Sequence, residues 1–204
     1  MTDVVRLEVQ GEIALITVNN PPVNALGHAV REGLQKVFQS AEADPQVRAV
    51  ALVCEGNTFI AGADIKEFGT PPQAPSLPEV IEIIEACNKP SVAVIHGTAL
   101  GGGLEVALGC HYRIARKDAK VGLPEVKLGL LPGAGGTQRL PRLAGVEKAL
   151  DMIVSGTPIS AAEAVEHSIV DELFEGDLED AGLAYARRMV EEGRAPRRTG
   201  EQSQ

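Results

Sequence analysis

The stretch Gly101-Gly-Gly-Leu-Glu105 lies between two strongly apolar segments. Residues 91–95 before it are typical of a buried strand, and residues 106–108 after it are apolar enough for a buried helix. A glycine at a helix start costs roughly 0.5–1 kcal/mol relative to alanine, so three in a row indicate a requirement other than stability. A ligand that approaches the backbone closely, with helix N-terminal N–H groups pointing at it, is one such requirement.

The carboxylate of Glu105 follows the glycines in an otherwise apolar segment. Because glutamate is almost never fully buried without a partner, the two features together predict a backbone anion hole with a carboxylate one turn away. The glycines lack the G-x-G-x-x-G spacing of a dinucleotide site, and no Gly-Lys-Ser/Thr completes a P-loop. The structural alternatives are a helix-packing role for the glycines and an ion pair for Glu105.

Three separated stretches resemble, in this order, the signature of the enoyl-CoA hydratase/isomerase (crotonase) superfamily. They are FIAGADIK at 59–66, KPSVAVIHGTALGGGLEVALGC at 89–110 and LPEVKLGLLPGAGGTQR at 123–139. NPPVNAL at 20–26 and GCHYRIA at 109–115 resemble most the hydratase part of peroxisomal-type multifunctional β-oxidation enzymes. His111 is similar to that branch, whereas many other members have Asp after the cysteine.

Alternating strand-like and helix-like segments indicate an α/β domain with parallel central strands. The resemblance implies the β-β-α spiral of the crotonase fold, lacking the C-terminal helical extension with which stand-alone hydratases usually continue. We expect a core domain over residues 1–193 and a polar, disordered tail over residues 194–204. Residues 69–78 contain four prolines and are expected to form a mobile lid or surface loop.

The hydrophobic pattern predicts these elements: a hairpin of residues 6–10 and 12–18 around Gly11, strands at 47–54, 91–95 and 112–115, and helices at 28–43, 78–87, 147–154, 161–167 and 178–191.

The resemblance assigns an oxyanion hole to the backbone N–H groups of Ala63 and Gly102. Such a pair suits an acyl-CoA thioester, because reaction at the adjacent carbons places negative charge on its carbonyl oxygen. The resemblance also assigns Glu105 and Glu125 as the catalytic pair. Two carboxylates can activate water and protonate the α-carbon if their environments hold them in different protonation states. Apolar neighbours are expected to raise the pKa of Glu125 by desolvation.

Asp64, Ile65 and Lys66 follow the oxyanion alanine and are the expected substrate-binding residues. Lys66 either contacts the CoA phosphates or is solvated. Arg139 and Arg142 are interpreted as surface or intersubunit salt-bridge residues.

Other chemistry has weaker support. Two glutamates also suit a glycosidase, but sugar sites usually stack aromatic side chains, and the chain has no Trp, two Tyr and four Phe. Ser91 with His96 is a possible nucleophile pair, although no G-x-S-x-G elbow surrounds the serine. His96 and His111 fall in apolar runs and are expected to be core histidines.

Composition limits the partners. The net charge of −9 and the pI of about 5.0 disfavour a nucleic-acid or anionic-membrane surface. Cys54, Cys87 and Cys110 are dispersed, which favours reduced core thiols in a cytoplasmic protein over disulfides or a metal site.

We therefore expect an enoyl-CoA hydratase that converts a trans-2-enoyl-CoA to a 3-hydroxyacyl-CoA without a metal or redox cofactor, coenzyme A being part of the substrate. The alternatives are an enoyl-CoA Δ-isomerase on the same fold and a non-catalytic acyl-CoA-binding or scaffold fragment. A homo-oligomer is the expected assembly, with a separate dehydrogenase chain as the alternative partner. Acyl chain length is not predicted.

Overall fold

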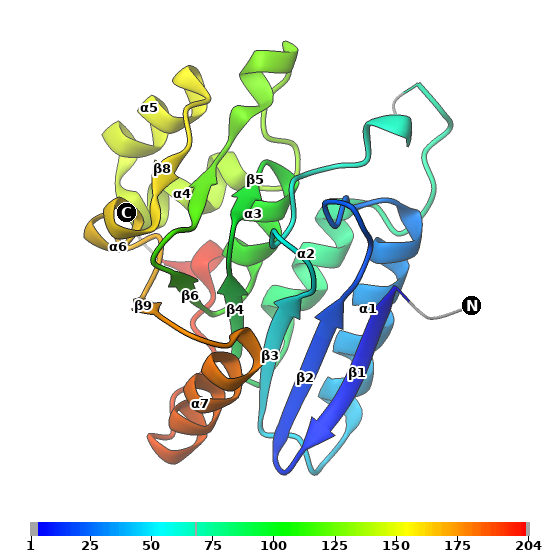
Figure 1. Cartoon of the computed structure of the whole chain (residues 1–204). Helices are drawn as coiled ribbons and strands as arrows, with labels where there is room; N and C mark the ends of the chain where they lie inside the picture. The colour runs from blue at the N-terminus through cyan, green and yellow to red at the C-terminus, as the bar shows by residue number, and fades with distance from the viewer. Residues whose placement is uncertain (1–3, 68, 203–204) are drawn as a thin grey trace.

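The computed structural model describes residues 4–67 and 69–202, and helices flank a six-stranded sheet on both faces (Figure 1). The strands follow the order β1-β2-β3-β4-β6-β9. They are β1 (Val5–Gln10), β2 (Ile13–Val18), β3 (Ala49–Cys54), β4 (Ser91–Ile95), β6 (Tyr112–Arg116) and β9 (Glu172–Phe174).

The sheet begins with the predicted hairpin and continues with parallel strands. β1 and β2 pair antiparallel, and Gly11 between them has a φ of +66°, a conformation that favours glycine. β2, β3, β4, β6 and β9 all pair parallel. The predicted hairpin, the strands at 47–54, 91–95 and 112–115, and the parallel centre of the sheet are therefore confirmed. β9 is a strand that the sequence pattern did not predict.

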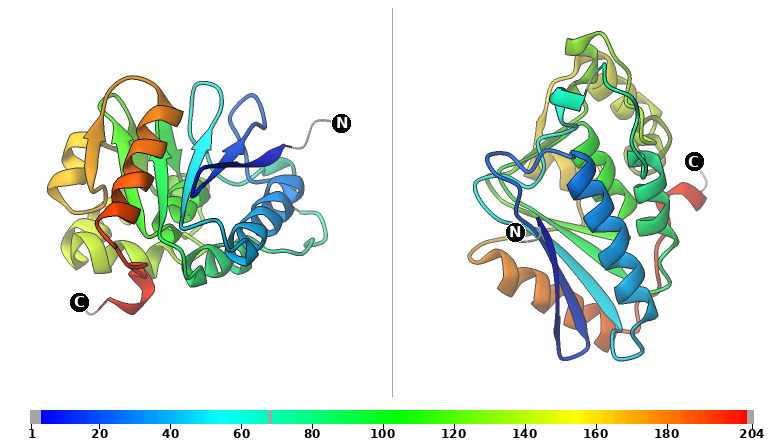
Figure 2. Two further views of the ribbon diagram at one scale, coloured as in Figure 1. Left: turned by 90° about the horizontal axis from the view of Figure 1, so that it is seen from below. Right: turned by 90° about the vertical axis from the view of Figure 1, so that its right-hand side faces the viewer.

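Side-chain alternation in β2 divides the core into two parts. Ala14, Ile16 and Val18 face the larger core, which includes side chains of α1 (His28–Ala43), α2 (Leu77–Ala86) and α3 (Gly102–Gly109). Ile13 and Leu15 face the smaller core beneath α7 (Leu178–Glu191). The two views of Figure 2 show α7 on one side of the sheet and α1 on the other.

Local signals explain where the helices begin. Ser76 caps α2 in a capping box with Glu79, so this helix starts one residue before the predicted range. Ser160 accepts a hydrogen bond from the N–H of Glu163 and caps α6 (Ala161–Glu166). α1 and α7 have the predicted bounds. The remaining helices are α4 (Gly136–Ala144), α5 (Val146–Ser155) and α6 (Ala161–Glu166).

A second, three-stranded sheet is formed by segments for which the hydrophobic pattern predicts no strand. It has the order β5-β7-β8, with strands β5 (Thr98–Leu100), β7 (Lys120–Gly122) and β8 (Ile159–Ser160). Segments of two or three residues are too short to show an alternating pattern, which explains why they were missed. The glycine run and Glu105 follow β5, and Glu125 follows β7, so this sheet helps to place the candidate site.

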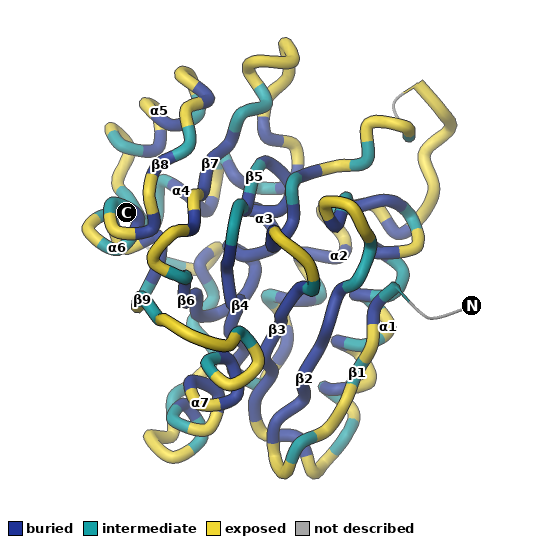
Figure 3. Tube along the Cα trace, in the orientation of Figure 1, coloured by how far each residue is buried: buried dark blue, intermediate teal, exposed yellow. Residues whose placement is uncertain are grey.

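Every residue of α3 is buried, as is every residue of β2, β3 and β4 (Figure 3). Arg113 is fully buried beneath α3 and donates hydrogen bonds to the carbonyls of Ala107 and Cys110. Cys54, Cys87 and Cys110 are buried free thiols, as expected. None of the helices in the described ranges is long and apolar enough to cross a membrane.

The segment after α7 differs from the expected disordered tail over the residues that the structure describes. Tyr112 donates a hydrogen bond to the carbonyl of Ala195, and Arg197 pairs with Asp171 at 2.5 Å. Arginine side chains hold this segment in place, because a guanidinium combines charge, several hydrogen-bond donors and stacking on aromatic rings. Arg197 lies over the ring of Tyr112, and η3 (Thr199–Glu201) follows. Residues 203 and 204 lie outside the described ranges.

Candidate active site

The glycine run and Glu125 start from the same edge of the small sheet. β5 and β7 are parallel neighbours, with Leu100 opposite Gly122. The N–H of Gly101 donates a 2.9 Å hydrogen bond to the carbonyl of Gly122. Parallel strands end at a common edge, so residues separated by more than twenty positions in sequence become neighbours.

The three glycines serve different purposes. Gly101 has a φ of +53°, which disfavours other residues. A Cβ on Gly103 would overlap the carbonyl oxygen of Ile60, so this glycine permits close backbone packing, as the structural alternative proposed. A Cβ on Gly102 would lie 2.8 Å from Leu77 Cδ2. Close packing alone therefore explains Gly103 but leaves open what the N–H of Gly102 faces.

Ala63 lies beside Gly102 because two single-residue bridges draw its loop inward. Leu26 pairs with Ala63, Ile60 pairs with Ala99, and the N–H of Leu26 donates to the carbonyl of Gly62 at 2.9 Å. The nitrogen of Ala63 lies 3.8 Å from the position that a Cβ on Gly102 would take. Among residues 4–67 and 69–202, no acceptor bonds the N–H of Ala63 or of Gly102. The two donors can thus serve one external oxygen.

Glu105 is held by the N-terminus of another helix. Glu105 is only 2% exposed, and its Oε1 accepts hydrogen bonds from the N–H groups of Ala134 and Gly136, both at 2.8 Å. Gly136 is the first residue of α4. Burial raises the pKa of the Glu105 carboxyl above its ordinary value, while these N–H donors and the Arg139 guanidinium oppose the rise.

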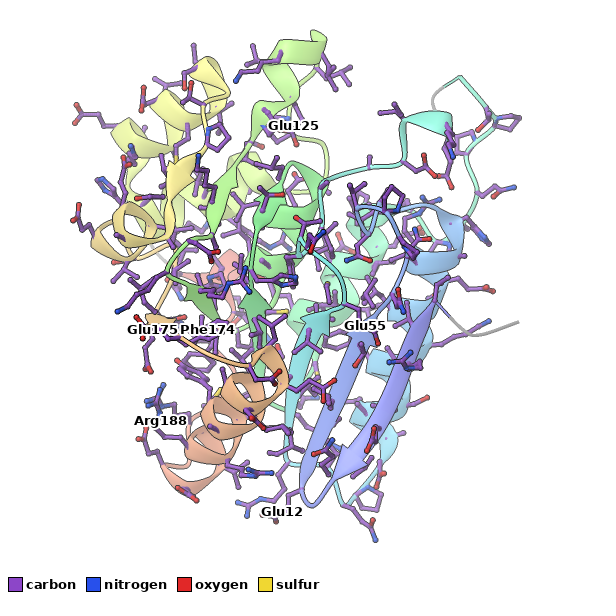
Figure 4. The ribbon with its side chains drawn as sticks, in the orientation of Figure 1. Glu12, Glu55, Glu125, Phe174, Glu175 and Arg188 are labelled. Atoms are coloured by element: carbon purple, nitrogen blue, oxygen red, sulfur yellow. The ribbon has the colours of Figure 1, made fainter. Side chains whose placement is uncertain are left out.

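Glu125 lies on η2 (Pro124–Leu128), and Figure 4 shows it at the opposite end of the molecule from Arg188 on α7. Its Oε2 is buried and has no hydrogen-bond partner among the described residues. Burial raises the pKa of the Glu125 carboxyl, a hydrogen bond from its own backbone N–H opposes the rise, and the neighbouring charge of Glu105 adds to it. The carboxyls of Glu105 and Glu125 are therefore close enough to interact, but they differ in their hydrogen-bond partners.

This difference favours different protonation states. The paired N–H donors stabilise an ionised Glu105, whereas the unpartnered oxygen and the nearby negative charge favour a neutral Glu125. One carboxylate base beside one carboxylic acid is the arrangement that acid–base chemistry at neutral pH requires.

Asp64, Ile65 and Lys66 extend the site toward solvent. Ile65 begins η1 (Ile65–Glu67) and is 70% exposed, and the N–H of Lys66 donates to Asp64 Oδ1 at 3.0 Å. Lys66 is exposed, which agrees with both expectations for this residue, a contact with the CoA phosphates and solvation.

A cavity of about 290 Å³ adjoins Ala63, one of the two N–H donors. Leu26, Ala63 and Leu77 line it, together with the proline-rich loop at residues 70–76. Arg31 fixes this loop, because its Nε donates to the carbonyl of Pro75 at 2.8 Å and its Nη2 to that of Gln73 at 3.1 Å. The expected loop is present, and its mobility stays a prediction.

Several other predictions can be compared with the structure. His96 and His111 are core residues, as expected, with 1% and 0% exposure. The pairing of Ser91 with His96 is wrong: Ser91 Oγ contacts His111 Nδ1 at 3.0 Å, because the neighbouring strands β4 and β6 bring these two together. Burial lowers the pKa of His111 to about 4.

The surface or intersubunit role of Arg139 is also wrong. Arg139 is only 8% exposed. Its guanidinium binds Glu85 of the same chain, because α2 and α4 both pack against α3. Arg142 instead hydrogen-bonds the carbonyl of Gln138. The donors Ala134 and Gly136 were not predicted either, although the Gly-Ala-Gly-Gly run at 133–136 offered a signal like that of the first glycine run.

Comparison with known proteins shows extensive similarity. The family described as enoyl-CoA hydratase/isomerase matches residues 8–202. A peroxisomal bifunctional enzyme of Danio rerio is 50% identical over 89% of this chain, and a probable enoyl-CoA hydratase of Bacillus subtilis is 47% identical over 81% of it and 67% of its own length. The crystal structure of an enoyl-CoA hydratase from Bacillus anthracis shares 34% identity and superposes with a TM-score of 0.85, covering 92% of this chain and 76% of that one.

These structural similarities confirm the expected crotonase-like fold. The chain spans 25% of the length of the Danio rerio relative, so most of that protein has no counterpart here.

Proposed function

Because the chain belongs to the enoyl-CoA hydratase/isomerase family, we propose that it adds water to a trans-2-enoyl-CoA to give a 3-hydroxyacyl-CoA. One observation carries this proposal: two carboxyls in contrasting surroundings lie close to the glycine run, where two neighbouring backbone N–H groups lack an acceptor in the described residues. Hydration needs a base for water, an acid for the α-carbon and donors for the thioester oxygen, and the site offers a candidate for each.

In the proposed mechanism, ionised Glu105 accepts a proton from a water molecule while the water oxygen forms a bond to C3 of the substrate. The C2–C3 π electrons move toward the thioester, whose oxygen becomes negative. The N–H groups of Ala63 and Gly102 donate to this oxygen, and removal of one such donor typically costs about 10²–10³ in turnover.

Neutral Glu125 then gives its proton to C2, which completes the addition. Glu105 is now protonated and Glu125 ionised, so one proton must move from the first to the second before the next cycle. Two carboxyls in one site are suited to that exchange, because each ionised group favours protonation of the other.

We propose that the exposed Asp64, Ile65 and Lys66 segment binds the CoA part, with the ammonium of Lys66 near phosphate. The reaction neither oxidises nor reduces its substrate, and Glu105, Glu125 and the N–H donors supply its proton transfers and charge stabilisation. We therefore propose that it proceeds without a metal or redox cofactor. The cytoplasmic location stays a prediction, since several relatives, including that of Danio rerio, are named as peroxisomal.

Enoyl-CoA isomerisation is the second candidate. Moving a double bond requires one group to carry a proton between two carbons, and the unpartnered Oε2 of Glu125 suits such a shuttle. A non-catalytic acyl-CoA-binding role would use the same donors but would need neither carboxyl.

We propose self-association through exposed apolar residues near the site. Val146, Leu150 and Val154 are 59–63% exposed at helical spacing on α5, which packs against η2. Leu128 and Leu131, at and after the end of η2, are 66% and 74% exposed. Such clusters mark interaction surfaces. A dimer or trimer is expected by light scattering, and a separate dehydrogenase chain is the alternative partner. A stable monomer of the purified chain at micromolar concentration would contradict self-association.

An absorbance assay tests the proposed activity. Purified protein is mixed with 2-enoyl-CoA substrates of short and medium chain length in the presence of a chelator and without nucleotide. Hydration should bleach the absorbance of the conjugated thioester. Folded protein that bleaches none of these substrates would exclude hydratase activity, and tight acyl-CoA binding in that case would support the scaffold role.

A further inference from the structure

The turn at residues 134–136 lies between the carboxylate of Glu105 and the guanidinium of Arg139. On one side, the N–H groups of Ala134 and Gly136 donate to Glu105 Oε1 at 2.8 Å. On the other side, Arg139 Nη1 donates to the carbonyl of Ala134 at 3.3 Å. One peptide segment thus connects a buried cation to a candidate catalytic carboxylate.

Contact between this turn and the guanidinium is close. Gly135 has a φ of +100°, and a Cβ at this position would overlap Nη1 of Arg139. Glycine is therefore required on two grounds, the left-handed backbone and the space that Arg139 occupies. A Cβ on Gly136 would lie 3.0 Å from Glu105 Oε1. The turn is thus packed between the guanidinium of Arg139 on one side and the carboxylate of Glu105 on the other.

Arg139 is itself fixed from α2. Its Nε and Nη2 donate to the two carboxylate oxygens of Glu85 at 3.2 and 2.7 Å, and both side chains are at most 14% exposed. A bidentate pair of this kind defines the orientation of a guanidinium more strictly than a single contact. Glu85 also accepts a hydrogen bond from the N–H of Gly200 at 2.7 Å, which ties it to η3.

We propose that Arg139 is a positioning residue for hydration: held by Glu85, it fixes the turn whose N–H groups keep Glu105 ionised and aimed at the attacking water. This inference rests on the proposed function for its catalytic consequence. Its structural content, the control of Glu105 through the turn, is independent of which enoyl-CoA the site accepts.

Charge adds to geometry. The positive charge of Arg139, which belongs to α4, lowers the pKa of Glu105. Glu85 on α2 partly neutralises Arg139 but is bound to the far side of the guanidinium. The charge of Glu105 therefore interacts with two groups, the cation of Arg139 and the carboxyl of Glu125. Removal of the cation should raise the pKa of Glu105.

The competing explanation is a tether between α2 and α4 that contributes to stability alone. A tether and a positioning residue both affect folding, so stability does not separate them. The pH at which Glu105 ionises does, because only the proposed role connects Arg139 to that carboxyl.

Arg139→Gln, Arg139→Lys and the control Arg142→Gln are compared in hydration assays between pH 4 and pH 9. Arg142 lies on the same helix and bonds only the carbonyl of Gln138 among the described residues. We expect Arg139→Gln to lower kcat by up to about 10²-fold, as small displacements of catalytic groups do, with a smaller change in KM. The acidic limb of kcat/KM should shift to higher pH. Arg139→Lys, which keeps the charge but not the bidentate geometry, should leave the limb in place and restore part of kcat. Arg142→Gln should match the unmodified protein.

Carbon-13 NMR of labelled glutamate carboxyls provides a readout without turnover. The resonance that disappears in Glu105→Gln identifies Glu105, and its pKa should be higher in Arg139→Gln than in the unmodified protein. An unchanged pKa in folded Arg139→Gln would overturn the inference and leave a tether. Absence of hydratase activity in the unmodified protein would instead contradict the proposed function, and this titration would still decide the role of Arg139. If Arg139→Gln does not fold, Glu85→Gln, which releases the guanidinium from α2, is titrated in its place, with a shifted Glu105 pKa expected.

Discussion

Glu105 and Glu125 face one site, but the chain supports them in opposite ways. Glu105 belongs to a helix that is buried throughout, and one of its oxygens accepts two backbone N–H bonds. Glu125 belongs to a short 3₁₀ segment at the surface, and its buried Oε2 has no partner among residues 4–67 and 69–202. Burial raises the pKa of both carboxyls. Two N–H groups from the turn at residues 134–136 oppose the rise at Glu105, whereas at Glu125 only its own backbone N–H does so.

The comparison teaches that two identical side chains acquire different chemistry from their backbone surroundings. A carboxyl between fixed donors is suited to remain ionised and oriented. A carboxyl with a free oxygen in an apolar setting is suited to carry a proton and to exchange it. The predictions below test whether these roles are separate.

The largest expected effect comes from Glu105→Gln and Glu125→Gln. Each should lower the rate of hydration by about 10²–10⁴, the usual contribution of a positioned acid or base. Any conversion of a 3-enoyl-CoA to a 2-enoyl-CoA should survive Glu105→Gln better than Glu125→Gln, since one carboxyl suffices for a proton shuttle. Steady-state assays of both reactions check this. Equal, small losses in both variants would show that the carboxyls are structural.

Gly102→Pro should affect both reactions, because hydration and isomerisation both place negative charge on the thioester oxygen that the proposed N–H donors bind. Proline lacks the N–H donor, and its loss should lower turnover by about 10²–10³. Proline is tolerated at the first position of a helix, which Gly102 occupies. Gly102→Ala is the matched control: it adds the same Cβ contact with Leu77 but keeps the donor. The ratio of the two variants measures the donor, with folding checked by circular dichroism. Equal activity in both would exclude the assignment.

Two glycine substitutions perturb one carboxyl each. A Cβ on Gly101 would lie 3.0 Å from Glu125 Oε1, and a Cβ on Gly136 would lie 3.0 Å from Glu105 Oε1. Contacting residues typically show coupling energies of about 0.5–3 kcal/mol in double-mutant cycles. Gly101→Ala should therefore couple to Glu125→Gln but not to Glu105→Gln, and Gly136→Ala should show the reverse. Cycles measured on kcat/KM check this, and crossed coupling would mean that the carboxyls act as one unit.

The smallest expected effect is on stability. A carboxyl whose pKa is raised in the folded state disfavours folding once it ionises, so the penalty grows as pH rises from the ordinary value of 4.5 through the folded-state pKa. Glu125→Gln should thus increase the free energy of unfolding at pH 7, and the gain should vanish below pH 4.5. Glu105→Gln should gain less, because the glutamine loses charge-assisted bonds from Ala134 and Gly136. Urea unfolding at both pH values measures this; a larger gain for Glu105→Gln would reverse the proposed contrast.

Local patterns predicted the regular part of the fold. The bounds of α1 and α7 follow from apolar residues at helical spacing, and the parallel strands follow from short apolar runs. The short strands β5, β7 and β8 have no such pattern. They exist because neighbouring segments pair with them, and this pairing places Glu125 beside the glycine run.

The role of Arg139 was missed for a related reason. An arginine on a helix with a polar face is usually solvated, and nothing local indicates that Glu85, more than fifty residues earlier, will bind it. Likewise, the polar composition of residues 194–202 favours disorder, whereas aromatic and acidic partners on β6 and before β9 hold Arg197 in place.

By itself, the sequence determined the family resemblance, the order of the main elements, and the two carboxyls and two N–H donors as candidates. Those features are carried by residues close together in the chain, whose spacing and motifs are visible directly. Only the tertiary structure decided how Glu105 and Glu125 differ, because that difference comes from the N–H groups of Ala134 and Gly136 and from an oxygen left without a partner. Protonation depends on what surrounds a group in space, and only folding brings those surroundings together.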